Sequence, residues 1–312
     1  MNPLIILISL IWGYHWVVMK MALNYFPPIT FSALRFIIGV LILLGICFWK
    51  RVGLPRKDQW KWIITSGLTQ TFYVHVIVQI SVNYIDAGLS SVLYYTMPFW
   101  LTILAHFLIP GDRLNLAKVV GLTSGISGLF LIMNISFHPD QWGGTSLGIQ
   151  LLVISASITW AISNIIFKTK VKPDGYLSFT AYQMAIGTIG LLLLALVTES
   201  PADIVWNSAS IIYLLFSGMI ATALSFYLWF YVLSKENASK TSIALLLTPV
   251  FGVLSSILFL GETLQVKTIF GIILIILGIR VVNSASSIKL WSSWRSKKEC
   301  EKIEHSVQKT NE

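Results

Sequence analysis

Ten apolar stretches, each close to the length of a membrane-spanning helix, most constrain what this chain can fold into. A helix needs about twenty apolar residues to cross a bilayer. Helices are the expected spanning element, because unpaired backbone groups are costly in lipid and the alternating pattern of a membrane β-barrel does not occur. The ten expected helices cover residues 3–21, 29–49, 62–84, 88–109, 115–134, 146–168, 176–197, 209–233, 239–260 and 266–284.

Composition agrees with an all-α integral membrane protein. Only 11% of the 312 residues are charged and the mean hydropathy is +0.77, whereas a soluble domain carries about 25% charged residues. The net charge of +9 would suit a nucleic-acid partner, but a chain this apolar offers no solvated basic groove, so we expect none. Cys47 and Cys300 lie in unlike surroundings and no C-x-x-C spacing occurs, so no disulfide, metal site or cofactor is expected.

The positions of lysine and arginine orient the helices. With the N-terminus in the cytoplasm, 19 of these residues fall on the cytoplasmic side, Lys20 and Lys267 fall outside, and Arg35 lies within a helix. Cytoplasmic loops of membrane proteins carry such an excess of positive charge. We therefore expect a multi-pass protein of the cell (plasma or inner) membrane with both termini in the cytoplasm.

One segment, from Trp12 to Gly39, occurs twice. Six of its residues recur at a constant offset of 148, whereas unrelated segments of this length would share about two identities. The six pairs are Trp12 and Trp160, Lys20 and Lys168, Phe31 and Phe179, Ala33 and Ala181, Ile38 and Ile186, and Gly39 and Gly187. The chain is therefore expected to consist of two copies of a unit that is about half its length.

An odd number of spans in each half decides how the two copies are oriented. After five spans the second copy enters the membrane from the opposite side, which is the inverted-repeat arrangement of many secondary transporters. The expected fold is thus ten transmembrane helices in two inverted five-helix repeats. Repeat 1 covers residues 3–134, an inter-repeat loop 135–145, repeat 2 residues 146–284, and a cytoplasmic charged tail 285–312.

Four motifs make the chain similar to the EamA-type branch of the drug/metabolite transporter superfamily. They are W-G-x₆-K at Trp12, F-S-A-L-R-F at Phe31, the mid-helix proline Pro98, and the G-[DE]-x-L turn at Gly111, each echoed at least in part in the second half. The resemblance implies an exporter or permease of small organic solutes with a central cavity between the repeats. The chain departs at Asp112, where the family more often has Glu, and at Gln183, which takes the repeat position of Arg35 and indicates that the halves have specialised.

Polar residues within the helices are candidates for contact with a solute. Arg35 either binds an anionic group or extends outward and ties helix ends together. His75 and Gln79 continue a four-residue spacing that begins at Thr71, and this polar face either lines a cavity or bonds neighbouring helices. Every Asp and Glu falls in a loop, at a helix end or in the tail, so a proton relay or sodium site on a buried carboxylate is not expected.

Aromatic residues form the other candidate group. One helix face carries Trp12, His15, Trp16 and Met19, and the equivalent face in the second half carries Trp160 and Asn164. Such a stripe is either core packing or a cavity wall. The expected cavity residues are Trp12, His15, Trp16, Arg35, His75, Gln79, Tyr94, Tyr95, Trp160, Asn164 and Gln183.

Pro98 and Pro249 occupy matching places inside two expected helices. Each proline removes a backbone hydrogen bond and so produces either a static kink or a hinge beside the central site.

The sequence thus favours a secondary transporter, an exporter of small organic metabolites such as amino acids or related amphipathic solutes, working by alternating access. His15 and His75 are the groups suited to proton coupling, because histidine titrates near neutral pH. One alternative is an intramembrane enzyme, which is disfavoured because H-E-x-x-H, G-x-S-x-G and P-loop motifs do not occur. The other is a lipid-binding or ligand-binding membrane receptor on the same scaffold. The sequence carries no signal of oligomeric state.

Overall fold

The computed structural model of the chain describes residues 2–81, 84, 90, 93–132, 144–172, 174–260 and 266–283. All structural statements below concern these residues. The charged tail, most of the expected inter-repeat loop and the second G-[DE]-x-L turn at Gly261 lie outside them.

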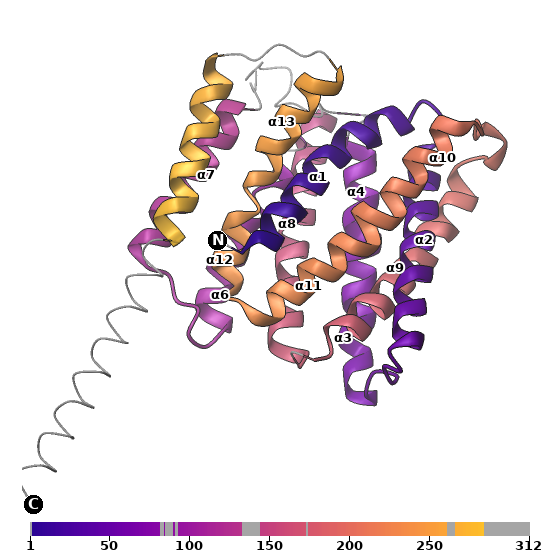
Figure 1. Cartoon of the computed structure of the whole chain (residues 1–312), viewed down its shortest axis with the longest axis horizontal. Coiled ribbons are helices and arrows are strands. Elements are labelled where there is room, and N and C mark those ends of the chain that lie inside the picture. Colours follow the sequence, from indigo (N-terminus) through magenta and orange to yellow (C-terminus); the bar gives the residue numbers. More distant parts are fainter. Residues whose placement is uncertain are drawn as a thin grey trace, which may run out of the picture.

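The described residues form helices and connecting turns (Figure 1). The helices of the first half are α1 (Pro3–Ala22), α2 (Pro28–Trp49), η1 (Lys57–Gln59), α3 (Trp60–Ser66), η2 (Gly67–Tyr73), α4 (Val74–Ser81), α6 (Met97–Leu108) and α7 (Leu116–Ile132). Those of the second half are α8 (Gly144–Lys170), α9 (Tyr176–Thr198), η4 (Pro201–Asp203), α10 (Ser208–Leu215), η5 (Phe216–Leu224), α11 (Ser225–Lys235), α12 (Ala238–Ala244), α13 (Leu247–Leu260) and the helix Val266–Asn283.

Eight helical stretches in the described part of the chain are long and apolar enough to cross a membrane. Two shorter apolar helices, Met97–Leu108 and Leu116–Leu131, accompany them. Their outer faces carry large apolar side chains, such as Leu41, Val197 and Leu258, that are 65%, 84% and 77% exposed. In a soluble protein such surfaces would aggregate, whereas in a bilayer they meet lipid. The prediction of an all-α integral membrane protein is confirmed.

Two π turns interrupt the regular helices at corresponding places in the two halves. Segment η2 joins α3 to α4 and segment η5 joins α10 to α11, each as one continuous helical rod. Within two residues of the end of each π turn, a side chain bonds a carbonyl five residues back. His75 Nδ1 lies 3.2 Å from the Gln70 oxygen, and Ser225 Oγ donates to the Ile220 oxygen at 2.9 Å. A π turn is rare and frequently marks a functional site.

Both expected proline positions are helix breaks. A turn at Tyr95 and Thr96 precedes α6, in which Pro98 is the second residue. A turn at Leu245 and Leu246 separates α12 from α13, in which Pro249 is the third residue. Proline fits the first turn of a helix, where its missing N–H is not needed, but it ends a helix that approaches from the N-terminal side.

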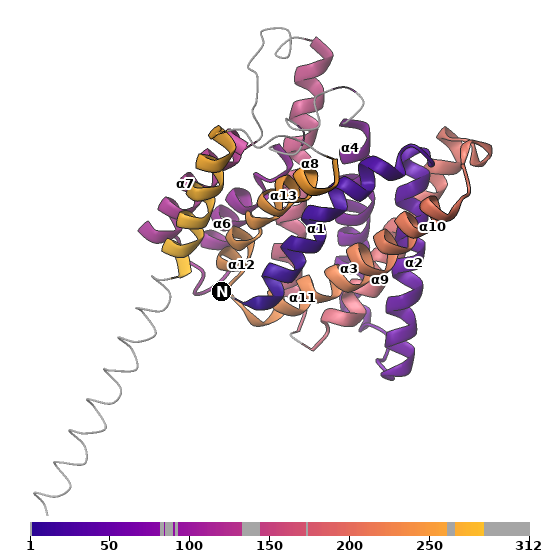
Figure 2. The same ribbon diagram turned by 45° about the horizontal axis from the view of Figure 1, so that its top comes forward.

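Close glycine contacts hold one outer edge of the bundle. At the edge formed by α7 and the helix Val266–Asn283, seen side by side in Figures 1 and 2, Gly121 lies against Gly278 and Gly128 against Gly271. Helices in membranes associate through small residues that let the backbones approach. Helices α2 and α9 pack together at the opposite edge in both views.

We predict that alanine substitutions at two glycines affect the stability of the protein differently. A Cβ at Gly128 would lie 2.5 Å from the Gly271 carbonyl oxygen, whereas one at Gly45 in α2 meets nothing within 4 Å. Gly128→Ala should lower the thermal stability of the detergent-purified protein by about 1–3 kcal/mol, because the helices must move apart. Gly45→Ala should leave stability unchanged or raise it by up to about 1 kcal/mol, because alanine favours helix. Equal melting temperatures for the two variants would contradict this account of the edge.

Candidate functional site

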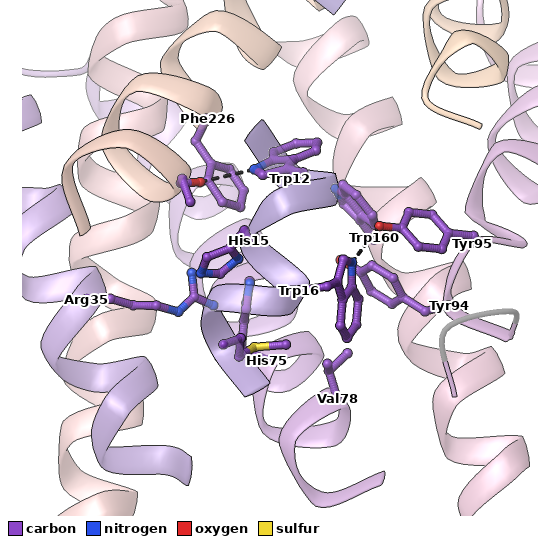
Figure 3. A pocket seen from close by; sticks show the side chains of 12 residues that line it. Trp12, His15, Trp16, Arg35, His75, Val78, Tyr94, Tyr95, Trp160 and Phe226 are labelled. Carbon is purple, nitrogen blue, oxygen red and sulfur yellow. Dashed lines mark hydrogen bonds between the residues drawn. The ribbon is translucent and has the colours of Figure 1, made fainter. Parts of the chain in front are cut away.

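A cavity of about 70 Å³ lies among helices of both halves (Figure 3). That volume has room for several water molecules. The residues that line it are Trp12, His15, Trp16, Met19, Arg35, His75, Val78, Tyr94, Tyr95, Trp160, Ala221 and Phe226. Eight of the eleven expected cavity residues are among them.

Aromatic rings form one wall of the cavity. The Tyr94 ring stacks on Trp160 with centroids 5.0 Å apart and planes 20° apart, and Trp12 meets Trp160 edge-on at 6.0 Å. Trp16 Nε1 donates to the Tyr95 hydroxyl at 2.7 Å. The helix break before Pro98 brings both tyrosines to this wall, because Tyr95 lies in the turn that precedes α6 and Tyr94 lies directly before that turn. Flat rings in such an arrangement favour a flat or apolar ligand group.

Arg35 brings the one formal charge among the lining residues. Its side chain is 4% exposed. Nη1 donates to Thr222 Oγ1 at 3.0 Å, and the guanidinium carbon lies 4.4 Å from the centre of the Phe36 ring. Nε has no hydrogen-bond partner in the described structure. A charged group buried with an unused donor is a strong candidate for binding an anion.

Two histidines lie beside Arg35 in the cavity (Figure 3). His75 Nδ1 is 3.2 Å from the Gln70 oxygen and 3.0 Å from the Thr71 oxygen. Because carbonyls only accept hydrogen bonds, Nδ1 carries the proton, and Nε2 of the neutral ring is left as an acceptor. His15 Nε2 has no partner among the side chains and backbone described. The two rings can therefore take part in hydrogen bonds with a solute.

Three expected cavity residues are buried outside the lining. Gln79 donates to Ser32 Oγ at 2.9 Å, one turn along α4 from His75. The Asn164 side-chain oxygen accepts from Trp229 Nε1 at 3.0 Å. The Gln183 side-chain oxygen accepts from Thr71 Oγ1 at 2.9 Å. All three side chains form hydrogen bonds between helices, which is the common alternative role of a polar side chain within a membrane helix.

The pairs Arg35–Thr222 and Gln183–Thr71 occupy equivalent places in the two halves. Arg35 and Gln183 are 148 residues apart, and Thr71 and Thr222 are 151 apart, matching the repeat offsets in the sequence. In each pair a residue of one half reaches the π turn of the other.

Four lining residues were not expected there: Met19, Val78, Ala221 and Phe226. Ala221 contributes its carbonyl, which accepts from Trp12 Nε1 at 3.0 Å. Phe226 closes the cavity beside Trp12, with ring centroids 5.5 Å apart. Met19 belongs to the helix face of Trp12 and Trp16, for which the sequence leaves core packing and a cavity wall as alternatives. An alanine whose backbone faces a cavity leaves no signal in a sequence.

Comparison with known proteins decides the family. A family model described as "EamA-like transporter family" matches residues 2–134 and 147–284. The chain belongs to the EamA-like transporter family. It is therefore a multi-pass membrane transporter and not an enzyme.

Relatives of this EamA-like chain carry transporter names. It is 33% identical to the "Uncharacterized transporter YoaV" of Bacillus subtilis (strain 168) over 278 residues, or 88% of this chain and 94% of that protein. It is 26% identical over 289 residues to a Salmonella typhimurium protein named "Probable amino-acid metabolite efflux pump", covering 89% and 93% of the two chains. A crystal structure with 17% identity superposes with a TM-score of 0.77 over 90% of this chain and 96% of that one, which shows a shared fold.

The G-[DE]-x-L turn of this EamA-like chain has a structural role away from the cavity. Asp112 is 2% exposed and accepts from both the backbone N–H and the hydroxyl of Ser239, at the start of α12, and from the Lys118 ammonium. Burial alone would raise the pKa of the Asp112 carboxyl, but the bonds from Lys118 and Ser239 hold that pKa below its ordinary value. Asp112 thus caps a helix of the second half from a turn of the first. Among the residues described, no group of three or more His, Cys, Asp or Glu could hold a metal ion.

We predict that Asp112→Asn lowers the free energy of unfolding by about 3 kcal/mol at pH 7, because it leaves the Lys118 ammonium buried without its counter-charge. Since the folded pKa of Asp112 is depressed, this stabilisation is complete above about pH 4 and is lost as the pH falls further. Thermal unfolding in detergent between pH 3 and 7 measures both effects.

The matched control is Asp58→Asn, which breaks the Arg56–Asp58 pair of 3.2 Å between side chains that are each 66% exposed. Such exposed pairs contribute about 0–1 kcal/mol. If the two variants lost the same stability, Asp112 would not be the helix-capping carboxylate described here.

Proposed function

We propose that the chain is a secondary transporter of the plasma or inner membrane that exports small organic metabolites by alternating access. The observation that carries this proposal is the cavity itself, which is lined from α1, α2 and α4 of the first half and from α8, η5 and α11 of the second. A single charge among aromatic rings suits a solute with an apolar part and an anionic part. Amino acids and related amphipathic solutes belong to this class.

The proposed architecture is ten transmembrane helices in two inverted five-helix repeats, residues 3–134 and 146–284. The loop 135–145 connects them, the charged tail 285–312 follows, and both termini lie in the cytoplasm. Three repeated features support it: the π turns η2 and η5, the proline breaks, and the equivalent pairs Arg35–Thr222 and Gln183–Thr71. Inverted repeats allow one site to face either side of the membrane in turn.

We place the moving contacts of this cycle at the side that the charge distribution assigns to the cytoplasm. There Asp112 bonds to Ser239, and the Asn2 amide donates to the Glu236 carboxylate at 2.7 Å, so both bonds join the first half to the second. We infer that these bonds close the site toward the cytoplasm and separate when it opens there. The breaks at Pro98 and Pro249 are the proposed hinges.

His15 and His75 are the proposed groups for coupling transport to protons. Both line the cavity with Arg35, so a change in the charge of either ring would act on a bound anion.

Transport by purified protein in liposomes tests the proposal. Liposomes loaded with a panel of labelled amino acids, organic acids and amines should release one solute class faster than protein-free liposomes, and an imposed proton gradient should change the rate. Trp160→Ala should reduce that release about fivefold, because it removes the ring that stacks on Tyr94 and a contact of this kind is worth about 1 kcal/mol.

The matched control is Trp49→Ala, since Trp49 is 81% exposed at the end of α2. It should transport at the wild-type rate. Release of no solute by folded wild-type protein, in either direction, would refute the transporter mechanism proposed here. Equal loss in both tryptophan variants would instead refute the cavity as the solute site.

A further inference from the structure

The formal charge in the cavity is of one sign, positive. Arg35 is cationic, and the carboxylates in the described part of the chain all lie in loops or at helix ends: Asp58, Asp112, Asp174, Glu199, Asp203 and Glu236. None of them lines the cavity. A positive group brought into the cavity would therefore meet like charge and no counter-ion, in surroundings where charges interact strongly.

Unused hydrogen-bond donors are the second observation. Arg35 Nε and Trp160 Nε1 carry hydrogens and have no acceptor in the part of the chain that the structure describes, and both side chains are 4% exposed. A buried donor without an acceptor costs about 1–3 kcal/mol, so a ligand that supplies acceptors gains binding energy. An ionised carboxylate is an acceptor only, with two oxygens and no donor.

The aromatic wall is the third observation. Tyr94 and Trp160 lie stacked, and Trp12 and Trp16 stand beside them at 6.0 and 6.5 Å between ring centroids. The rings and the guanidinium belong to the same cavity (Figure 3), so one ligand can reach both.

We propose that the cavity selects monoanionic carboxylates that carry a flat aromatic group, in preference to zwitterionic amino acids or amines of the same skeleton. The carboxylate binds at Arg35 and the ring lies against the aromatic wall. An α-ammonium on such a ligand weakens binding, because it is held near the guanidinium and the described cavity lining supplies no protein carboxylate to pair with it. Selection by charge thus comes from an unfavourable contact as well as a favourable one. This inference rests on the proposed function and narrows its substrate class.

Three ligands that share a phenylethyl group test the selection. They are 3-phenylpropanoate, which is an anion at pH 7, phenylalanine, which is a zwitterion, and 2-phenylethylamine, which is a cation. Equilibrium dialysis of each labelled ligand against the full-length purified protein should give a Kd for 3-phenylpropanoate at least tenfold lower than that for phenylalanine, and no saturable binding of the amine.

The variant Arg35→Gln separates the effect of the charge at position 35 from any structural role of that side chain. Glutamine is the residue that the second half places at the equivalent position, where Gln183 bonds to Thr71, so a glutamine at position 35 has a precedent for bonding Thr222. The preference for the anion should fall to twofold or less in this variant and remain above fivefold in Arg35→Lys. Lys61→Gln removes the same charge from an exposed residue of α3 and should leave the preference unchanged.

The outcomes distinguish this inference from the proposed function. Equal or tighter binding of phenylalanine or of the amine overturns the selection, and so does an anion preference that survives Arg35→Gln. If none of the three ligands binds but the loaded liposomes still release another solute, the selection is overturned and the transporter stands. If the liposomes release nothing, the proposed function fails as well.

Discussion

The close packing of one helix of each half on the π turn of the other half is the contact on which the rest of the structure depends. Gly39 of α2 lies against Thr222, and Gly187 of α9 lies against Thr71, so near that a Cβ would collide. At this distance the polar ends of Arg35 and Gln183 reach the threonine hydroxyls. Lipid supplies no hydrogen-bond partners, so these bonds must be made within the bundle, and they hold the single charge of the cavity in place.

Irregular backbone is the second constraint, because within a membrane it is tolerated only where protein or a water-filled cavity surrounds it. The π turn η2 ends beside His75, whose ring bonds two of its carbonyls, and η5 supplies the Ala221 carbonyl to Trp12. The break before Pro98 carries Tyr94 and Tyr95. The two π turns and the break before Pro98 therefore lie beside the cavity, and the side chains that bond π-turn carbonyls there, His75 and Trp12, are among those that line it.

Helical periodicity predicted much of this site, since a fixed spacing transfers directly to a shared helix face. It gave Trp12, His15 and Trp16, and the repeat then gave Trp160. Periodicity does not give depth along a helix. It therefore predicts Gln79 as a cavity residue, although Gln79 lies about 6 Å farther along α4 than His75 and bonds to Ser32.

The π turns have no sequence signature, and they change which residues correspond between the halves. The side-chain bond that His75 makes to Gln70 is made in the second half by Ser225, 150 residues later, and not by Phe226 at the offset of 151. In the proposed transport cycle, movement between two states requires halves that are alike, whereas recognition of a charged solute requires that they differ. The paired sites meet both demands at one position: the bond to threonine is kept on both sides, while the guanidinium occurs on one side only. A second arginine in place of Gln183 would put another buried cation in the bundle without a carboxylate to pair with, so only one of the two equivalent positions can carry a buried charge at low cost.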